Sequence, residues 1–212
     1  MLGIVNWIVA IIGGTFALTG LSIDNIFKSK IFYPFLAFAM VYFVSIWISQ
    51  KDLKNKGDIL LNSLPINRKD IVEGRYLSIF TYILLITIYI FTISHIATIL
   101  TKDIFPGATM SGLSLLLVIG LSLIIFSIYL PFQYYNIGKI QVFNQIFYIL
   151  LIILPTILGR YLDKIMTSRL LIYFMNLNLS LNGIILIILG LGIVLYLISI
   201  QVSIIIYKHK EF

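Results

Sequence analysis

The 212-residue sequence is short of charge and has no cysteine. Charged residues make up 11% of the chain, less than half of the roughly 25% that is usual in soluble domains. The absence of cysteine excludes disulfides, cysteine-ligated zinc and thiol nucleophiles. With 60% hydrophobic residues and a mean hydropathy of +1.08, the chain lacks the polar surface that a water-soluble fold needs. The composition therefore predicts an integral membrane protein.

Six apolar stretches are long enough to cross a hydrocarbon core of about 30 Å, which takes roughly 20 helical residues. Isoleucine, leucine and phenylalanine mix in them without strict alternation, which favours helices over barrel strands. No basic segment precedes the first stretch, so we expect a retained helix and not a cleaved signal. We predict an all-α polytopic protein with one transmembrane domain over residues 1–212 and spans near Ile4–Ile23, Ile31–Ile48, Tyr76–Leu100, Ser111–Tyr134, Phe143–Gly159 and Ile184–Ile206.

The positions of the basic residues predict the orientation in the membrane. The net charge is +7, and most basic residues flank apolar runs, which indicates topology and not nucleic-acid binding. Six of them fall between the second and third spans: Lys51, Lys54, Lys56, Arg68, Lys69 and Arg75. By the positive-inside rule, we expect this loop and both termini to be cytoplasmic.

Reactive groups are scarce where a membrane enzyme would need them. The chain has eight acidic residues and two histidines, and only His95 lies within an expected span. A buried carboxylate for proton coupling and an H-E-x-x-H zinc pair are both missing. The phosphate-binding pattern G-x-x-x-x-G-K-[ST] is also missing. We therefore expect no catalytic residue, metal or cofactor on this chain, and any ATPase to be a separate polypeptide.

Two prolines and a stripe of small residues mark positions of special geometry within the spans. Pro131 and Pro155 are expected to kink the fourth and fifth helices, because each proline frees a backbone carbonyl. Small residues recur every three or four positions in the first span, at Ala10, Gly13, Gly14, Ala17 and Gly20. This spacing suits close helix packing, either within the bundle or between subunits.

The loop between the second and third spans contains the signals of two cytoplasmic helices. A short helix is predicted by an apolar face that a proline follows: Ile59, Leu60, Leu64 and Pro65. Asn67 is a good N-cap for a second helix, and Asp70 favours its first turn. This second helix would run through Ile71 and Tyr76 directly into the third span. Such a segment either transmits force to the span or is only a solvated connector.

A family resemblance rests on this loop. Residues 58–72 resemble the L-N-S-L-P-[IV]-[ST]-R-[KE]-[DE]-I-V signature of small type-2 ABC exporter permeases, and residues 74–77 are similar to the G-[KR]-Y-L that follows it. Residues 130–139 resemble the element that closes the fourth helix in that family, and residues 210–212 resemble its usual ending. The most specific match is the block from Leu61 to Tyr76.

The resemblance implies a permease of two six-helix subunits, homodimeric or heterodimeric, docked on two cytoplasmic ATPases that bind ATP and magnesium. The loop would be the coupling helix seated in an ATPase groove. Its buried anchors would be Leu60, Leu61, Leu64 and Ile66, its polar contacts Asp58, Arg68, Lys69 and Asp70, and Pro65 and Asn67 would lie between them.

The expected function is therefore the membrane subunit of an ATP-driven exporter in a bacterial cell membrane. Relatives of this size handle antimicrobial or amphipathic peptides, such as phenol-soluble modulins, and spans rich in Phe, Tyr and Ile also suit a lipid-like cargo. Three other functions stay open. One is an immunity-type protein that sequesters a peptide without transporting it, and another is the substrate-binding membrane subunit of an energy-coupling vitamin importer. The third is an integral-membrane enzyme, which the scarcity of carboxylates and histidines disfavours.

Overall fold

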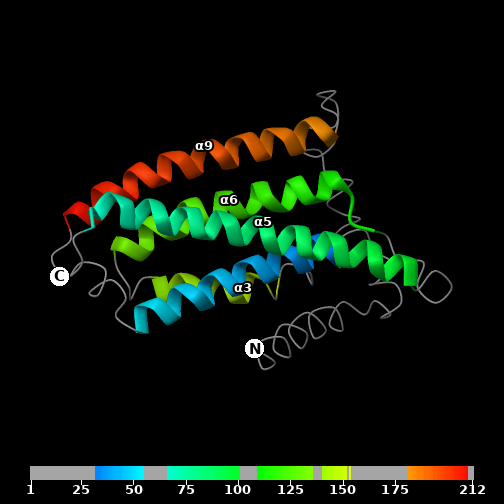
Figure 1. The fold of residues 1–212 in the computed structure, drawn as a ribbon, viewed down its shortest axis with the longest axis horizontal. Coiled ribbons are helices and arrows are strands. Elements are labelled where there is room, and N and C mark those ends of the chain that lie inside the picture. The colour runs from blue at the N-terminus through cyan, green and yellow to red at the C-terminus, as the bar shows by residue number, and fades with distance from the viewer. Residues whose placement is uncertain are drawn as a thin grey trace.

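The computed structural model describes residues 32–54, 66–100, 109–135, 140–151, 153 and 181–209. They form four long helices, α3 (Phe32–Lys54), α5 (Arg68–Leu100), α6 (Gly112–Tyr135) and α9 (Leu181–Lys208). A shorter apolar helix covers Ile140–Leu151. Within these ranges there is no strand, and the long helices run roughly side by side (Figure 1). The expected all-helical architecture is confirmed for this part of the chain.

Four helices are long and apolar enough to cross a membrane. These candidate spans are Tyr33–Lys51, Arg68–Ile96, Gly112–Tyr135 and Asn182–Lys208, and they match the expected second, third, fourth and sixth spans. The expected first span, Ile4–Ile23, lies outside the described residues. The fifth, Phe143–Gly159, overlaps the helix Ile140–Leu151 and otherwise lies outside them. The chain is thus a multi-pass helical membrane protein with at least four candidate spans.

Local signals set the starts of the helices. In α3, Pro34 lies in the first turn, where its missing N–H breaks no helical hydrogen bond. Ser111 precedes α6, and its Oγ accepts a hydrogen bond from the backbone N–H of Ser114 at 3.1 Å. α5 begins after Asn67, as the capping pattern predicts, and continues without a break through Tyr76 to Leu100.

Three serine and threonine hydroxyls on α5 are satisfied within their own helix. The side chains of Ser78, Thr81 and Thr87 each donate to the backbone carbonyl four residues earlier, at 2.6–2.8 Å. In a bilayer a hydroxyl has no water to bond, so this backbone partner is what makes these residues tolerable in a span.

α6 packs against both α9 and α3. The α6–α9 contact is the most extensive between two helices in the described residues, and the contact of α6 with α3 is smaller. α5 contacts α3, α6 and α9. Figure 1 shows α9 and α3 on opposite sides of the α5–α6 pair.

The basic residues of the described helices lie toward one end of the bundle. α5 begins at the same end of the bundle where α3, α6 and α9 finish (left in Figure 1). We call this end, which contains Arg68 and Lys208, the charged end. In the described part of the chain every lysine and arginine lies toward it: Lys51, Lys54, Arg68, Lys69, Arg75 and Lys208.

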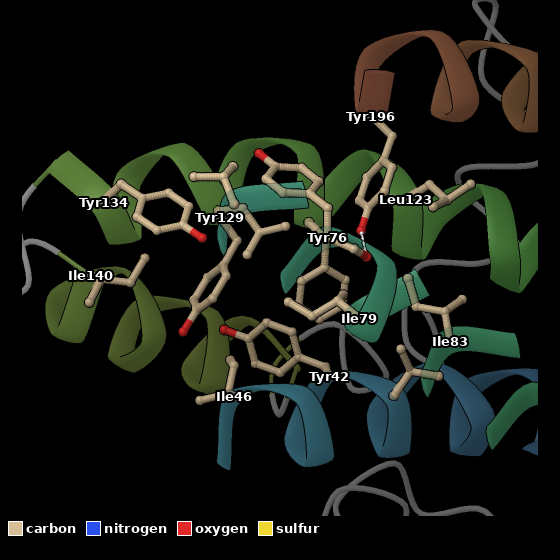
Figure 2. Close-up of a cluster of buried hydrophobic side chains, with 14 of the residues drawn as sticks. Tyr42, Ile46, Tyr76, Ile79, Ile83, Leu123, Tyr129, Tyr134, Ile140 and Tyr196 are labelled. Atoms are coloured by element: carbon tan, nitrogen blue, oxygen red, sulfur yellow. Dashed lines mark hydrogen bonds between the residues drawn. The ribbon is translucent and has the colours of Figure 1, made fainter. Parts of the chain in front are cut away.

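The core joins all of these helices and is rich in tyrosine. Tyr42, Tyr76, Tyr129 and Tyr207 are among its largest fully buried side chains. Figure 2 shows the Tyr196 hydroxyl pointing at the backbone of Tyr76, while Tyr42 and Tyr129 meet on the other side of α6. The tyrosine hydroxyls therefore lie inside the bundle, where the partner of each one matters.

Candidate functional site

The start of α5 is the described part of the predicted ATPase-contacting segment. Ile66 and Asn67 precede the helix, and Arg68, Lys69 and Asp70 form its first turn. The Asn67 carbonyl accepts hydrogen bonds from the N–H groups of Asp70 and Ile71 at 3.0 and 3.3 Å. Its side-chain amide donates to the Asp70 carboxylate at 3.4 Å. Asn67 therefore closes the helix start, through its carbonyl and its contact with Asp70.

The other side chains of this turn are accessible. Ile66 is 43% exposed, and Lys69 forms an exposed pair with Glu73 one turn later, with Nζ 3.4 Å from Oε1. Surface pairs of this kind contribute little stability, so Lys69 can exchange partners easily. The remaining predicted interface residues, Asp58, Leu60, Leu61, Leu64 and Pro65, lie outside the described residues.

Arg68 faces into the bundle's charged end and joins two helices. Its Nη1 donates to the backbone carbonyl of Lys208 at 2.9 Å and to that of Tyr207 at 3.5 Å. The last carbonyls of a helix have no partner within the helix, and a cation there also meets the negative end of the helix dipole. Arg68 thus caps α9 from the first turn of α5, a role that the sequence analysis did not anticipate.

Two turns further along, a buried hydrogen-bond network ties α5, α6 and α9 together. The Tyr76 hydroxyl lies 2.6 and 2.7 Å from the hydroxyls of Ser199 and Ser203, and 2.9 Å from the Ser199 carbonyl. The Ser199 hydroxyl also donates to the Ser127 carbonyl of α6 at 2.6 Å. In return, the Tyr196 hydroxyl donates to the Tyr76 carbonyl at 2.7 Å (Figure 2). We call these five residues the tyrosine–serine network.

The sequence contained a signal for this network that was not used. Ser199 and Ser203 are four residues apart on an otherwise apolar helix, so they share one face. Two hydroxyls on one face of a span mark the side that meets another helix, because lipid offers them no partner.

A glycine contact brings α6 and α9 close together at another level. A Cβ atom placed on Gly192 would lie 2.7 Å from the Gly120 carbonyl oxygen, and one on Gly120 would lie 3.0 Å from the Leu189 Cα. Only glycine permits this approach of the two backbones. The small-residue stripe expected in the first span lies outside the described residues.

A groove of about 750 Å³ lies beside the network. Residues of α5 and α9 line its sides, and Ile119 and Leu123 of α6 also contribute to its wall. We call it the α5–α9 groove. Its wall is apolar apart from Glu73 and Gln201 at one end, and it is lined by Glu73, Gly74, Tyr76, Leu77, Phe80, Ile119, Leu123, Leu189, Ile193, Tyr196, Leu197, Ile200 and Gln201.

His95 and Pro131 are the remaining predicted positions that the structure describes. The Nδ1 atom of His95 lies 2.9 Å from the Phe91 carbonyl, and its ring packs on the Phe91 ring at 4.4 Å. These local contacts are those of a packed residue. Pro131 lies inside α6, and Pro155 falls outside the described residues. Across the described ranges no group of three or more metal-ligating side chains occurs.

The fold and these contacts define a helical membrane protein with a charged end and a hydrogen-bonded α5–α9 pair. A family profile described as "ABC-2 family transporter protein" matches residues 3–208. The chain therefore belongs to the ABC-2 family of transporter membrane proteins. Searches among curated proteins and among solved structures gave no match. Membrane subunits of this family typically work with ATPase subunits.

Proposed function

We propose that the chain is the permease subunit of an ATP-driven exporter that moves amphipathic or lipid-like compounds outward across a bacterial cell membrane. Membership of the ABC-2 family supports the permease role. ATP and magnesium would bind to a separate ATPase, because the sequence contains no phosphate-binding loop. A second permease subunit, identical or related, would complete the transporter.

The observation that carries this proposal is the mechanical continuity at the charged end. α5 is one unbroken helix of 33 residues, about 50 Å long, that begins at Arg68. Arg68 holds the end of α9, and the tyrosine–serine network holds α9 again at Tyr76. A push on residues 66–70 would therefore move α5 and α9 together as one unit.

The exposed side chains at this end suit a protein partner. Ile66 offers an apolar contact, and Lys69 and Asp70 offer charges of both signs. The predicted anchors Leu60, Leu61 and Leu64 immediately precede them in the chain. The ATPase would seat on this segment, and closure of the ATPase would deliver the force.

The distribution of basic residues supports an orientation with the charged end in the cytoplasm. Every described lysine and arginine lies toward that end, as the positive-inside rule requires of the cytoplasmic side. α9 also ends on this side, at Lys208. This orientation also gives the charged end access to ATP.

Co-purification of the full-length tagged chain in mild detergent tests the proposal. We expect an ATPase subunit to be recovered with the wild-type chain and to be lost with Leu64→Glu, because a charge would replace a predicted buried anchor. Lys69→Glu should weaken recovery. The matched Lys51→Glu variant reverses a charge at the same end of the bundle, outside the predicted interface, and should keep the partner.

Arg68 is left unchanged in this test, since its bonds to α9 would confuse partner loss with a structural defect. Recovery of the folded wild-type chain without any nucleotide-binding subunit would contradict the exporter function. Equal recovery with the Leu64→Glu and Lys51→Glu variants would contradict the placement of the interface.

A further inference from the structure

The α5–α9 groove has its polar groups at one end only. Glu73 and Gln201 line the end of the groove nearest the charged end, and the rest of the wall is formed by Gly74 and by apolar and aromatic side chains. A site with this division suits a molecule that has one apolar part and one polar head. The helices that line the groove are candidate membrane spans, so we expect the apolar part of the groove to lie within the hydrocarbon core.

The hydrogen bonds between α5 and α9 locate the polar end relative to the bilayer. Tyr76 bonds to Ser199 and Ser203, so Gln201 lies at the level of Tyr76. Arg75 is the last lysine, arginine or carboxylate of α5, and beyond it 25 residues follow with no such charge. The polar end therefore lies where α5 enters the hydrocarbon core.

The groove extends from this boundary over about half of the membrane. From Gln201 to Leu189 the wall follows twelve residues of α9, which span about 18 Å. Half of a hydrocarbon core of about 30 Å is close to this length. An amphiphile that lies in one leaflet, with its head at the interface and its chain pointing inward, matches both the depth and the polarity of the groove.

The charge at the polar end selects the head group. Glu73 is the only acidic or basic residue among the described residues that line the groove. Its partner Lys69 is not part of the wall, and the pair is exposed, so an incoming amine can replace Lys69 at modest cost. The Gln201 amide can accept or donate a further hydrogen bond.

We propose that the α5–α9 groove binds an amine-bearing amphiphile from one leaflet, with its apolar chain along α9 and its amine at Glu73. The role of this amphiphile as cargo rests on the proposed export function. The binding site itself does not depend on that function, so the two are tested by separate readouts.

Two glycines provide a matched pair of variants. Gly74 lines the groove and Gly190 does not, and a Cβ atom at either position would meet no atom within 4 Å. A leucine at either position therefore introduces no clash at its Cβ and improves helix propensity. Only Gly74→Leu places its side chain in the groove.

Photolabelling with dodecylamine that carries a diazirine in its chain tests the site. The full-length chain, with any subunits that co-purify, is placed in phosphatidylcholine nanodiscs, which have no net charge to concentrate the amine. Labelled peptides are mapped by mass spectrometry. The control probe is dodecanoic acid with the same diazirine.

We expect the amine to label residues 189–201 more strongly than the acid does. Gly74→Leu should reduce this labelling about tenfold, as overfilling a packed site does, while Gly190→Leu leaves it unchanged. Glu73→Gln should reduce labelling by the amine about threefold, the size expected for an exposed charge pair, without affecting the acid. Equal labelling by the two probes, or unchanged labelling in Gly74→Leu, would overturn the proposal.

ATP hydrolysis by the complex gives the second readout. If the amphiphile is cargo, dodecylamine stimulates hydrolysis in the wild type and in Gly190→Leu but not in Gly74→Leu. Groove labelling without such stimulation would remove the cargo role and keep the site. Absence of an ATPase in the preparation would contradict the export function, while the labelling pattern would still show whether the groove binds the amine.

Discussion

The two sides of α6 are built differently. On the α9 side, Ser127 accepts a hydrogen bond from Ser199, and Gly120 and Gly192 bring the two backbones together. On the opposite side, aromatic rings from α3, α6 and the helix Ile140–Leu151 form the contact. Tyr42 and Phe147 lie 4.1 Å apart between ring centroids, and Tyr129 packs on Phe143 at 6.1 Å.

The same contrast holds for the buried polar atoms. The hydroxyls of the tyrosine–serine network all have close partners. On the aromatic side, the Tyr42 hydroxyl makes one long bond of 3.3 Å to Asn144. Among the described residues, the Ser45 and Ser122 hydroxyls, both amide atoms of Gln133 and the Asn144 amide nitrogen are buried without a hydrogen-bond partner.

This difference teaches where the bundle is held and where it can change. Directional bonds and a backbone contact permit one arrangement of α6 and α9. Aromatic packing with unpartnered amides costs little to rearrange, because a shift can supply the missing hydrogen bonds. In a transporter, we expect α5, α6 and α9 to keep their mutual positions while α3 and the helix Ile140–Leu151 move against them.

The largest expected effect comes from the glycine contact. Gly192→Ala would push α6 and α9 apart, since its Cβ would lie 2.7 Å from the Gly120 carbonyl oxygen. We expect a loss of about 2 kcal/mol of stability, in the range of overpacked cores, measured as a lower midpoint of thermal unfolding in detergent. Gly190→Ala has open space around its Cβ and should be neutral or stabilising. Equal midpoints for the two variants would contradict the close approach.

A pair of tyrosine variants compares the two sides directly. Tyr76→Phe removes a hydroxyl with three close oxygen neighbours, and Tyr42→Phe removes one with a single 3.3 Å bond. We expect Tyr76→Phe to cost about 1 kcal/mol and Tyr42→Phe about half of that or less, in line with hydrogen bonds between membrane helices. Thermal unfolding of both variants checks the order, and the reverse order would remove the contrast.

Gln133→Leu should change stability in the opposite direction. Gln133 is 2% exposed and its amide has no partner in the described part of the chain. A buried amide without a hydrogen-bond partner costs free energy, and leucine of similar size removes that cost. We therefore expect the free energy of unfolding to rise by about 0.5–1 kcal/mol. Gln201→Leu, at the groove's exposed polar end, is the control and should change stability less. A clear loss of stability in Gln133→Leu would mean that its amide has a partner in the membrane.

The smallest effect on stability is expected at Arg68. Arg68→Ala removes the cap on the α9 carbonyls, which we expect to cost about 0.5 kcal/mol and to be weakened by salt. Lys69→Ala, which breaks the exposed pair with Glu73, is the control for stability and should cost about 0.3 kcal/mol or less. If the cap transmits force, Arg68→Ala should also reduce transport coupled to ATP hydrolysis more than Lys51→Ala does, because Lys51 lies outside the predicted interface. Equal coupling in both variants would show that α9 is driven through Tyr76 alone.

Much of the fold was predictable because each membrane helix satisfies its own backbone. The second, third, fourth and sixth expected spans coincide with α3, α5, α6 and α9 to within a few residues at most ends. The largest difference is α5, which begins eight residues before the expected third span at Tyr76. Its early start was itself expected from Asn67, since a capping residue acts within one turn.

The candidate site was predictable only in part. Arg68 was expected to face a partner protein, yet it also holds the end of α9, 140 residues away in the sequence. Glu73 and Gln201 belong to no motif, and they line one groove only because α5 and α9 pack side by side. A contact between distant residues leaves no local pattern when each residue taken alone is compatible with solvent or lipid.

The sequence by itself determined that the chain is a membrane protein, where the four described candidate spans lie, which family it belongs to and which end of the described helices has the basic residues. These properties follow from composition, length and short-range signals, each of which acts within a few residues. Only the tertiary structure decided that α9 is the partner of α5, that Tyr76 meets Ser199 and Ser203, and that a groove with one polar end lies between the two helices. The physical reason is that apolar helices interact with lipid almost equally well. Their pairing therefore depends on a few hydroxyls and glycines, which stabilise the bundle only when the two helices are in contact.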